Sequence, residues 1–211
     1  MNSLPNLLIL EGGIAAGKTS LLHNLANEYN LYALEEPVTD NPYLAKFYED
    51  PKKWSFEFQM WFLEQRIQHY KHACQIAIEQ PNNIVILDRS VFSDSVFARL
   101  AFQDGFISQN QFDQYLIKYN DIVSKIPLPT AVVYLDVSPE TCLYRIKNIR
   151  KRDYEMNIQV EYLEGLDACY KILVQQLKGM GCRVYNVDWT MFGSTSTIYN
   201  IYESAKTCLA E

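Results

Sequence analysis

The sequence predicts one α/β domain with a parallel sheet covered by helices on both faces. Four short segments are almost wholly apolar: "NLLIL", "NIVIL", "AVVYL" and "CRVYNV". Strands that are buried on both faces have this composition, and such strands belong to parallel sheets. A weaker fifth candidate, "LYALEEP", ends in two carboxylates. We therefore expect a five-stranded parallel sheet flanked by helices, with ligands at the carboxyl ends of its strands.

Length and composition support one domain over residues 1–211. The chain is 48% hydrophobic and carries a net charge of −6, which disfavours a nucleic-acid partner. No apolar run approaches the roughly 20 residues of a membrane span, and no export signal is expected. The five cysteines are scattered and never form a C-x-x-C pair, which favours reduced thiols and a cytoplasmic location.

A phosphate-binding loop is predicted at residues 12–19. "GGIAAGKT" follows an apolar segment and fits G-x-x-x-x-G-K-[ST], whose backbone amides cradle phosphates at a helix N-terminus. Lys18 is expected to reach the β- and γ-phosphates, and Thr19 to ligate Mg²⁺. The motif indicates a nucleoside triphosphate but not its acceptor. The predicted phosphate-binding residues are Gly12, Gly13, Ile14, Ala15, Ala16, Gly17, Lys18, Thr19 and Ser20.

Two helix starts are predicted by a capping side chain before a proline. Asn41-Pro42 and Asp50-Pro51 both have this pattern. In the second helix, Gln59, Phe62 and Arg66 share one face, and such a stripe either reads a planar base or packs in the core.

Acidic and basic residues at the predicted strand ends are candidates for chemistry. In "EEPV", Glu35 or Glu36 is either a general base or a surface turn acid. In "ILDRSVFSD", Asp88 is expected to help hold Mg²⁺, and Arg89 to stabilise charge on a transferring phosphate. The basic run "RIKNIRKR" at 145–152 is expected to clamp phosphates once a phosphate loop is present.

Several motifs in register resemble the deoxynucleoside kinases, the family that includes deoxycytidine, deoxyguanosine and deoxyadenosine kinases. They are the phosphate loop, "EEPV", "FYEDPKKWSFEFQMWFLEQR", "LDRSVFSD", "SPETCLYRI" and "VEYLEGL". The short spacing between "EEPV" and "FYEDP" resembles the compact bacterial-type members. The resemblance implies a P-loop kinase fold, a homodimer, feedback inhibition by the triphosphate product, and an arginine-rich lid at about 148–158 in which Arg150 and Arg152 bind the donor phosphates.

The resemblance also implies roles for single residues. Glu36 matches the general base for the sugar 5′-hydroxyl, with Arg89 and Lys18 as its catalytic partners, and Asp88 stands where the family usually has a glutamate that places Mg²⁺. The implied nucleoside-binding residues are Glu36, Tyr48, Gln59, Phe62, Arg66, Arg89, Asp94, Phe97 and Glu161.

Three departures from the family pattern affect the lid, the metal site and the base pocket. Asp88 is one methylene shorter than glutamate, Lys151 replaces a glycine between the two lid arginines, and Phe62 is bulkier than the residue in vertebrate deoxycytidine kinase.

The expected activity is Mg²⁺-ATP-dependent 5′-phosphorylation of a deoxynucleoside in nucleotide salvage. Arg66 and Asp94 resemble the purine and deoxycytidine kinases, so deoxyguanosine is expected first and deoxyadenosine second. A deoxycytidine or broad-specificity kinase is the alternative within the family. Outside it stand a thymidylate-type monophosphate kinase, which would need positive charge where Glu35 and Glu36 lie, and a non-catalytic nucleotide-binding module.

Overall fold

The computed structural model describes residues 5–36 and 41–207, which fold around a five-stranded, all-parallel sheet. The strand order is β2-β3-β1-β4-β5, which confirms the predicted fold class. The strands are β1 (Leu7–Gly12), β2 (Tyr32–Leu34), β3 (Val85–Asp88), β4 (Ala131–Asp136) and β5 (Val184–Asp188). The four apolar segments are all strands, and the weaker fifth candidate contributes three residues as β2.

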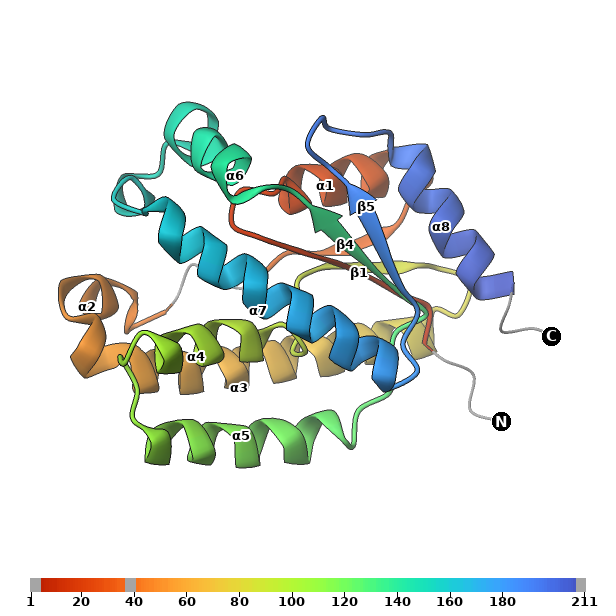
Figure 1. Ribbon diagram of the computed structural model, residues 1–211. Coiled ribbons are helices and arrows are strands. Elements are labelled where there is room, and N and C mark those ends of the chain that lie inside the picture. The colour runs from red at the N-terminus through yellow and green to blue at the C-terminus, as the bar shows by residue number, and fades with distance from the viewer. Residues whose placement is uncertain (1–4, 37–40, 208–211) are drawn as a thin grey trace.

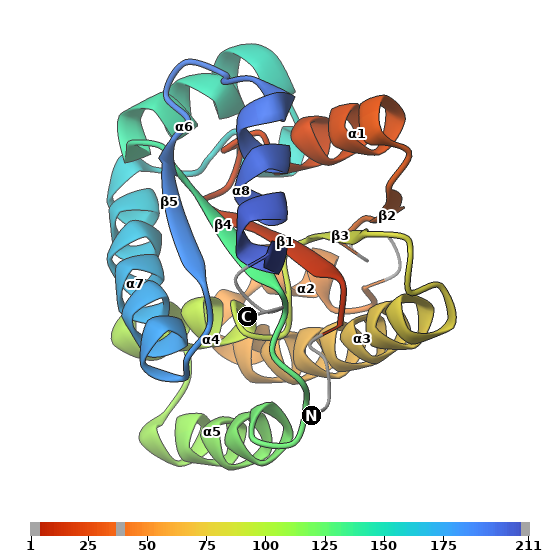
Figure 2. The same cartoon turned by 90° about the vertical axis from the view of Figure 1, so that its right-hand side faces the viewer.

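Helices cover both faces of the sheet. Figures 1 and 2 show α1 and α8 on one side and α3 and α4 on the other, with α5 outermost. Helix α7 packs against α4 and β5. None of the helices in the described ranges is long and apolar enough to cross a membrane. The helices are α1 (Lys18–Tyr29), α2 (Leu44–Glu49), α3 (Pro51–Glu79), α4 (Asp94–Gln103), α5 (Gln109–Val123), α6 (Pro139–Arg145), α7 (Val160–Gly179) and α8 (Thr195–Thr207).

The strand register brings three predicted motifs to one edge of the sheet. Leu10 in the central strand β1 pairs with Asp88 in β3, so the start of the phosphate loop lies close to Asp88. Leu34 in β2 pairs with Leu87 in β3, and Glu36 follows two residues later at the same edge. Parallel strands therefore place these groups together at their carboxyl ends, as expected for this type of sheet.

One of the two predicted helix starts is confirmed and the other is wrong. Asp50 caps α3, because its side chain accepts a hydrogen bond from the Lys53 amide at 3.2 Å and Pro51 is the first helical residue. Asn41 does not cap α2, which begins at Leu44 with Tyr43 as its cap. The Asn41 side chain instead accepts from the Tyr43 amide at 2.8 Å and closes a short turn before the helix.

Arg145, at the end of α6, joins the phosphate loop to the segment after β5. Its guanidinium is 5% exposed and donates to the carbonyl oxygens of Ala16, Trp189 and Thr190, each at 2.9 Å. This residue begins the basic run that the sequence assigns to a phosphate clamp. Here its main contacts are structural, because one planar guanidinium satisfies three backbone acceptors from distant parts of the chain.

We expect Arg145→Met to lower the free energy of unfolding by about 2 to 4 kcal/mol, because buried carbonyls lose their donor. Urea unfolding followed by circular dichroism measures the change. Lys147→Met is the matched control, since Lys147 is exposed one half-turn later, and it should change stability by no more than about 0.5 kcal/mol. Equal losses in the two variants would contradict the anchoring role.

Candidate active site

The phosphate loop joins β1 to α1 and depends on two glycines. Gly12 has φ 148°, and a Cβ there would lie 2.9 Å from the Leu135 carbonyl oxygen. Gly17 has φ 102° and precedes α1 without a capping side chain. A larger residue at Gly12 would clash with the neighbouring strand β4. The first turn of α1 has no capping side chain, so its backbone amides are available to bind an anion.

Lys18 folds back over this loop. Its ammonium donates to the carbonyl oxygens of Gly12 at 3.1 Å and Gly13 at 2.8 Å, and its side chain is 6% exposed. Burial and the nearby Arg89 guanidinium lower the pKa of Lys18 to about 8. The ammonium therefore lies beside the loop on which a phosphate would sit, and an anion there would favour its charged form.

Thr19 and Asp88 meet across the strand ends. The Thr19 hydroxyl donates to Asp88 Oδ2 at 2.5 Å, while Asp88 Oδ1 is buried and has no hydrogen-bond partner. A hydroxyl and a carboxylate with one unused oxygen are oxygen donors of the type that Mg²⁺ prefers. No group of three His, Cys, Asp or Glu side chains able to hold a metal occurs within the described ranges. The pair fits an ion that takes its other ligands from phosphates and water.

The structure separates the roles of Glu35 and Glu36. The Glu35 side chain is 58% exposed and faces His23 at 3.3 Å. Glu36 turns inward, where Oε1 pairs with Arg66 Nη2 and Oε2 lies 3.2 Å from Arg89 Nε. Burial by itself raises the pKa of Glu36, but the charges of Arg66, Arg89 and Lys18 outweigh it and lower the pKa to about 2.

Arg66, near the middle of α3, is held from its other side by Asp94. Its Nη1 donates to Asp94 Oδ1 at 2.5 Å, and the Tyr115 hydroxyl on α5 donates to Asp94 Oδ2 at 2.6 Å. Asp94 is fully buried, so both of its oxygens are used within the protein. Asp94 therefore acts here as an anchor for Arg66.

Glu36 lines a cavity of about 160 Å³, which we call the Gln59 cavity. Phe47 stacks on Phe58 with ring centroids 4.4 Å apart and forms part of an aromatic wall. The Arg66 guanidinium lies 5.0 Å from the Phe62 ring centroid and 5.4 Å from that of Phe97. Six of the residues predicted to bind the nucleoside line the cavity: Glu36, Gln59, Phe62, Arg66, Arg89 and Phe97.

The remaining predicted nucleoside-binding residues are placed differently. Asp94 lies behind Arg66 and is not part of the cavity lining, and Glu161 is exposed at the start of α7, also outside that lining. The side chain of Tyr48 lies outside what the structure describes. Tyr162, the neighbour of Glu161, lines the cavity together with Phe47 and Phe58. Sequence reasoning missed these rings because aromatic residues at helical spacing usually indicate core packing.

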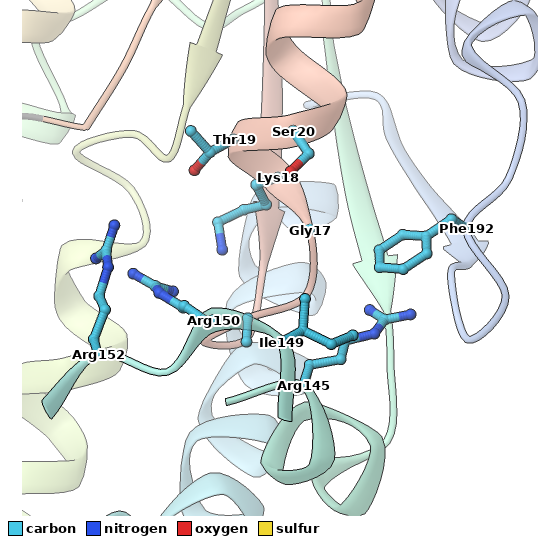
Figure 3. Close-up of a pocket in the computed structure, with 10 residues that line it drawn as sticks. Gly17, Lys18, Thr19, Ser20, Arg145, Ile149, Arg150, Arg152 and Phe192 are labelled. Carbon is cyan, nitrogen blue, oxygen red and sulfur yellow. The ribbon is translucent and has the colours of Figure 1, made fainter. Parts of the chain in front are cut away.

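A second cavity, of about 260 Å³, lies on the other side of the phosphate loop and is called the Phe192 cavity (Figure 3). Its walls are the start of α1, Arg145, the segment around Arg150 and Arg152, and Phe192. The Phe192 ring lies 4.1 Å from the Arg145 guanidinium and is 59% exposed. An exposed ring beside a phosphate loop offers a flat surface on which a base can stack.

The predicted lid segment contains two short helical turns, at Ile146–Arg150 and Asp153–Glu155. Arg150 Nε lies 3.1 Å from Glu155 Oε2, and Arg152 Nη1 lies 3.8 Å from Glu155 Oε1. Lys151 between them has φ 49°, a left-handed conformation that favours glycine. This conformation explains why a glycine suits that position in the family pattern.

The two cavities meet at four residues: Lys18, Thr19, Arg150 and Arg152 line both. Figure 3 shows the Lys18 ammonium on the phosphate-loop side of the opening, with the two arginines across from it. Three cationic side chains therefore meet at the junction of the cavities, and Glu155 pairs with the two arginines there.

Glu11 is a buried acid that sequence reasoning missed. It is 1% exposed, and its Oε1 accepts a hydrogen bond from the Ser90 hydroxyl at 2.7 Å. Arg89, the residue before Ser90, has φ 66°, a strained conformation for a side chain of this size. The Glu11 contact and the Arg89 amide bond to Leu10 O, at 3.0 Å, hold this turn in place. The signal that could have identified Glu11 in the sequence is a single carboxylate at the end of the apolar segment that forms β1.

Comparison with known proteins identifies the family to which this site belongs. The family model described as deoxynucleoside kinase matches residues 8–209. A deoxyguanosine kinase of Dictyostelium discoideum is 41% identical over 200 residues, which cover 95% of this chain and 70% of that protein. A deoxyguanosine kinase of Bacillus subtilis strain 168 is 33% identical over 178 residues, 84% of this chain and 82% of that protein.

Solved structures agree with these relatives. A deoxyadenosine kinase from M. mycoides with bound dATP has a TM-score of 0.79 and 27% sequence identity, covering 94% of this chain and 97% of that one. The motifs, the two joined cavities and the family match over nearly the whole length together show that the chain belongs to the deoxynucleoside kinase family.

Proposed function

We propose that the protein transfers the γ-phosphoryl group of ATP to the 5′-hydroxyl of a purine deoxynucleoside. The observation that carries this proposal is the junction of the two cavities at Lys18, Thr19, Arg150 and Arg152. A donor in the Phe192 cavity and a nucleoside in the Gln59 cavity would meet at these residues. Most of the catalysis then comes from positioning and from positive charge around the moving group.

Glu36 is the proposed general base. As the 5′-oxygen forms its bond to the γ-phosphorus, the bond from that phosphorus to the β-phosphate oxygen breaks, and the hydroxyl proton passes to Glu36. ADP and the nucleoside 5′-monophosphate are the products. Glu36 lies 3.2 Å from Arg89 and within the electrostatic influence of Lys18, which supports this role, because the same two charges would stabilise negative charge on the transferring phosphate.

Thr19 and Asp88 are the proposed holders of Mg²⁺ that arrives with ATP. The unused Asp88 Oδ1 supports this assignment. The ion would supply neutralisation of phosphate charge.

The acceptor site favours an uncharged substrate. The charges of Arg66 and Arg89 are both compensated by Glu36, and that of Arg66 also by Asp94, so an acceptor phosphate would have to compete with these carboxylates for either guanidinium. A monophosphate would also be repelled by the Glu36 carboxylate.

A purine base is proposed from the polar end of the Gln59 cavity. Arg66 can donate to purine O6 or N7, and Gln59 lies on the same face of α3. The named activities of the curated relatives favour deoxyguanosine over deoxyadenosine.

Five further proposals concern the domain, the assembly, the regulation, the metabolic role and the location of the protein. Residues 1–211 form one kinase domain, with the phosphate loop at 12–19 and a lid at about 148–158. A homodimer, feedback inhibition by the triphosphate product and a role in salvage rest on the family resemblance. A cytoplasmic location is supported by the four described cysteines, which are all free thiols.

Turnover with a panel of acceptors tests the function. Deoxyguanosine, deoxyadenosine, deoxycytidine, thymidine and thymidine monophosphate are each incubated with Mg²⁺-ATP, and kcat/KM is measured. We expect a purine deoxynucleoside to lead by about 10-fold or more, because a mismatched base leaves Arg66 and Gln59 unpaired. Phosphorylation of the monophosphate alone, or of nothing, would overturn the proposal.

Glu36→Gln is expected to lower the single-turnover rate by about 10² to 10⁴, the loss typical of a general base. Nucleoside binding, measured by calorimetry, should persist. Glu35→Gln is the neighbouring control and should stay within about twofold of wild type, because an exposed ion pair contributes little. Similar rates in the two variants would remove Glu36 from its catalytic role.

Phe192→Ala is expected to raise KM for ATP about 10-fold through loss of a stacking surface for the donor base. KM for the nucleoside should stay the same. Met191→Ala is the matched control, since Met191 is 85% exposed and does not line the Phe192 cavity. If Phe192→Ala leaves KM for ATP at the wild-type value, the donor base lies elsewhere.

A further inference from the structure

Both oxygens of the proposed general base are engaged before any substrate is bound. Arg66 Nη2 pairs with Glu36 Oε1, and Arg89 Nε lies 3.2 Å from Oε2. A carboxylate with the pKa of about 2 that these charges produce is a weak proton acceptor. The 5′-hydroxyl must therefore compete with a guanidinium for Glu36.

Both guanidinium groups line the Gln59 cavity, and Arg66 is the one that comes from the same helix face as Gln59. It lines the Gln59 cavity between Phe62 and Phe97 and is 6% exposed. Its Nε is buried and has no hydrogen-bond partner, so the group keeps an unused donor. A base that occupies this cavity meets the same guanidinium that holds Glu36.

Asp94, which is fixed by Tyr115, can keep Arg66 in place while Arg66 exchanges Glu36 for another partner. Asp94 is fully buried and fixed by the Tyr115 hydroxyl at 2.6 Å, so its bond to Arg66 Nη1 persists when the other end of the guanidinium turns. An arginine fork has five donors in one plane, which allows one carboxylate to stay bound while the remaining donors are exchanged.

We propose that Arg66 couples base recognition to catalysis. A base with an acceptor at the right edge draws the guanidinium away from Glu36 and frees Oε1 for the 5′-hydroxyl proton. Arg66 is then a specificity-determining residue that acts on the rate of the chemical step as well as on affinity. This inference rests on the proposed function and assigns a regulation of the same site.

The first test uses the wild-type enzyme and three nucleosides. Deoxyguanosine is compared with 7-deazadeoxyguanosine, which lacks N7, and with 2-aminopurine deoxyriboside, which lacks O6. Single-turnover rates are measured at saturating nucleoside, so that weaker binding and slow product release do not enter. We expect at least one analogue to react about 10- to 100-fold more slowly, the range of one charge-assisted hydrogen bond.

Variants then separate coupling from general damage. In Arg66→Met/Asp94→Asn, which removes both partners of the buried pair, the three nucleosides should react at rates within about threefold of one another. Arg66→Lys, which keeps a charge without the planar fork, should reduce the analogue effect if the double variant does not fold. Gln59→Leu is the matched control: it lines the same cavity without a charge to hold Glu36 and should retain the effect.

The outcomes distinguish this inference from the function on which it rests. If no deoxynucleoside is phosphorylated, the proposed function fails and the coupling with it. If deoxyguanosine is phosphorylated but both analogues reach its saturated rate, only the coupling fails, because the base then contributes affinity alone. A loss of rate that persists in the Arg66→Met/Asp94→Asn variant also overturns it.

Discussion

The active site depends on a cluster of buried charges in which Glu36 lies between Arg66 and Arg89. Burying an unpaired charge is costly, so each of these residues is stable in the interior only when its partner is also in place. Glu36 follows the shortest strand of the sheet, Arg66 lies near the middle of the longest helix, and Asp94 begins α4. With Arg89, which follows β3, the cluster joins four elements, and Tyr115 on α5 adds a fifth by its bond to Asp94.

Much of the fold was predictable because its signals are local. Strands buried on both faces must be apolar along their whole length, and β1 shows this at the neighbours Leu8 and Ile9, which point to opposite faces and are 1% and 0% exposed. The phosphate loop was predictable because Gly12 and Gly17 need backbone conformations and close contacts that other residues resist. The Asp50 cap is local too, since it bonds to an amide three residues away.

The partners within the site were not predictable in the same way. Arg66 meets Glu36 across 30 positions and Asp94 across 28, and no periodicity in the sequence encodes either pair. The family resemblance implied that Asp94 reads the base, and this stays a prediction; the structure adds that its two oxygens accept hydrogen bonds from Arg66 and from Tyr115 on another helix, which no local pattern indicates. Asn41 shows that a local signal can also mislead. Asn-Pro predicted a helix cap, but the Asn41 side chain closes a turn and the helix begins at Leu44.

The distribution of charge also explains why one site can hold a highly charged donor and an uncharged acceptor. Around the nucleoside end, the positive charges of Arg66 and Arg89 are balanced by carboxylates before substrate binds. At the junction, Lys18 donates to two backbone carbonyl oxygens, and phosphate oxygens can replace these neutral partners. Exchange of a neutral partner for an anion is favourable, whereas entry of an anion beside Glu36 is not. The phosphoryl group is therefore drawn to the junction, and the neutral sugar hydroxyl is the group that can approach it from the other side.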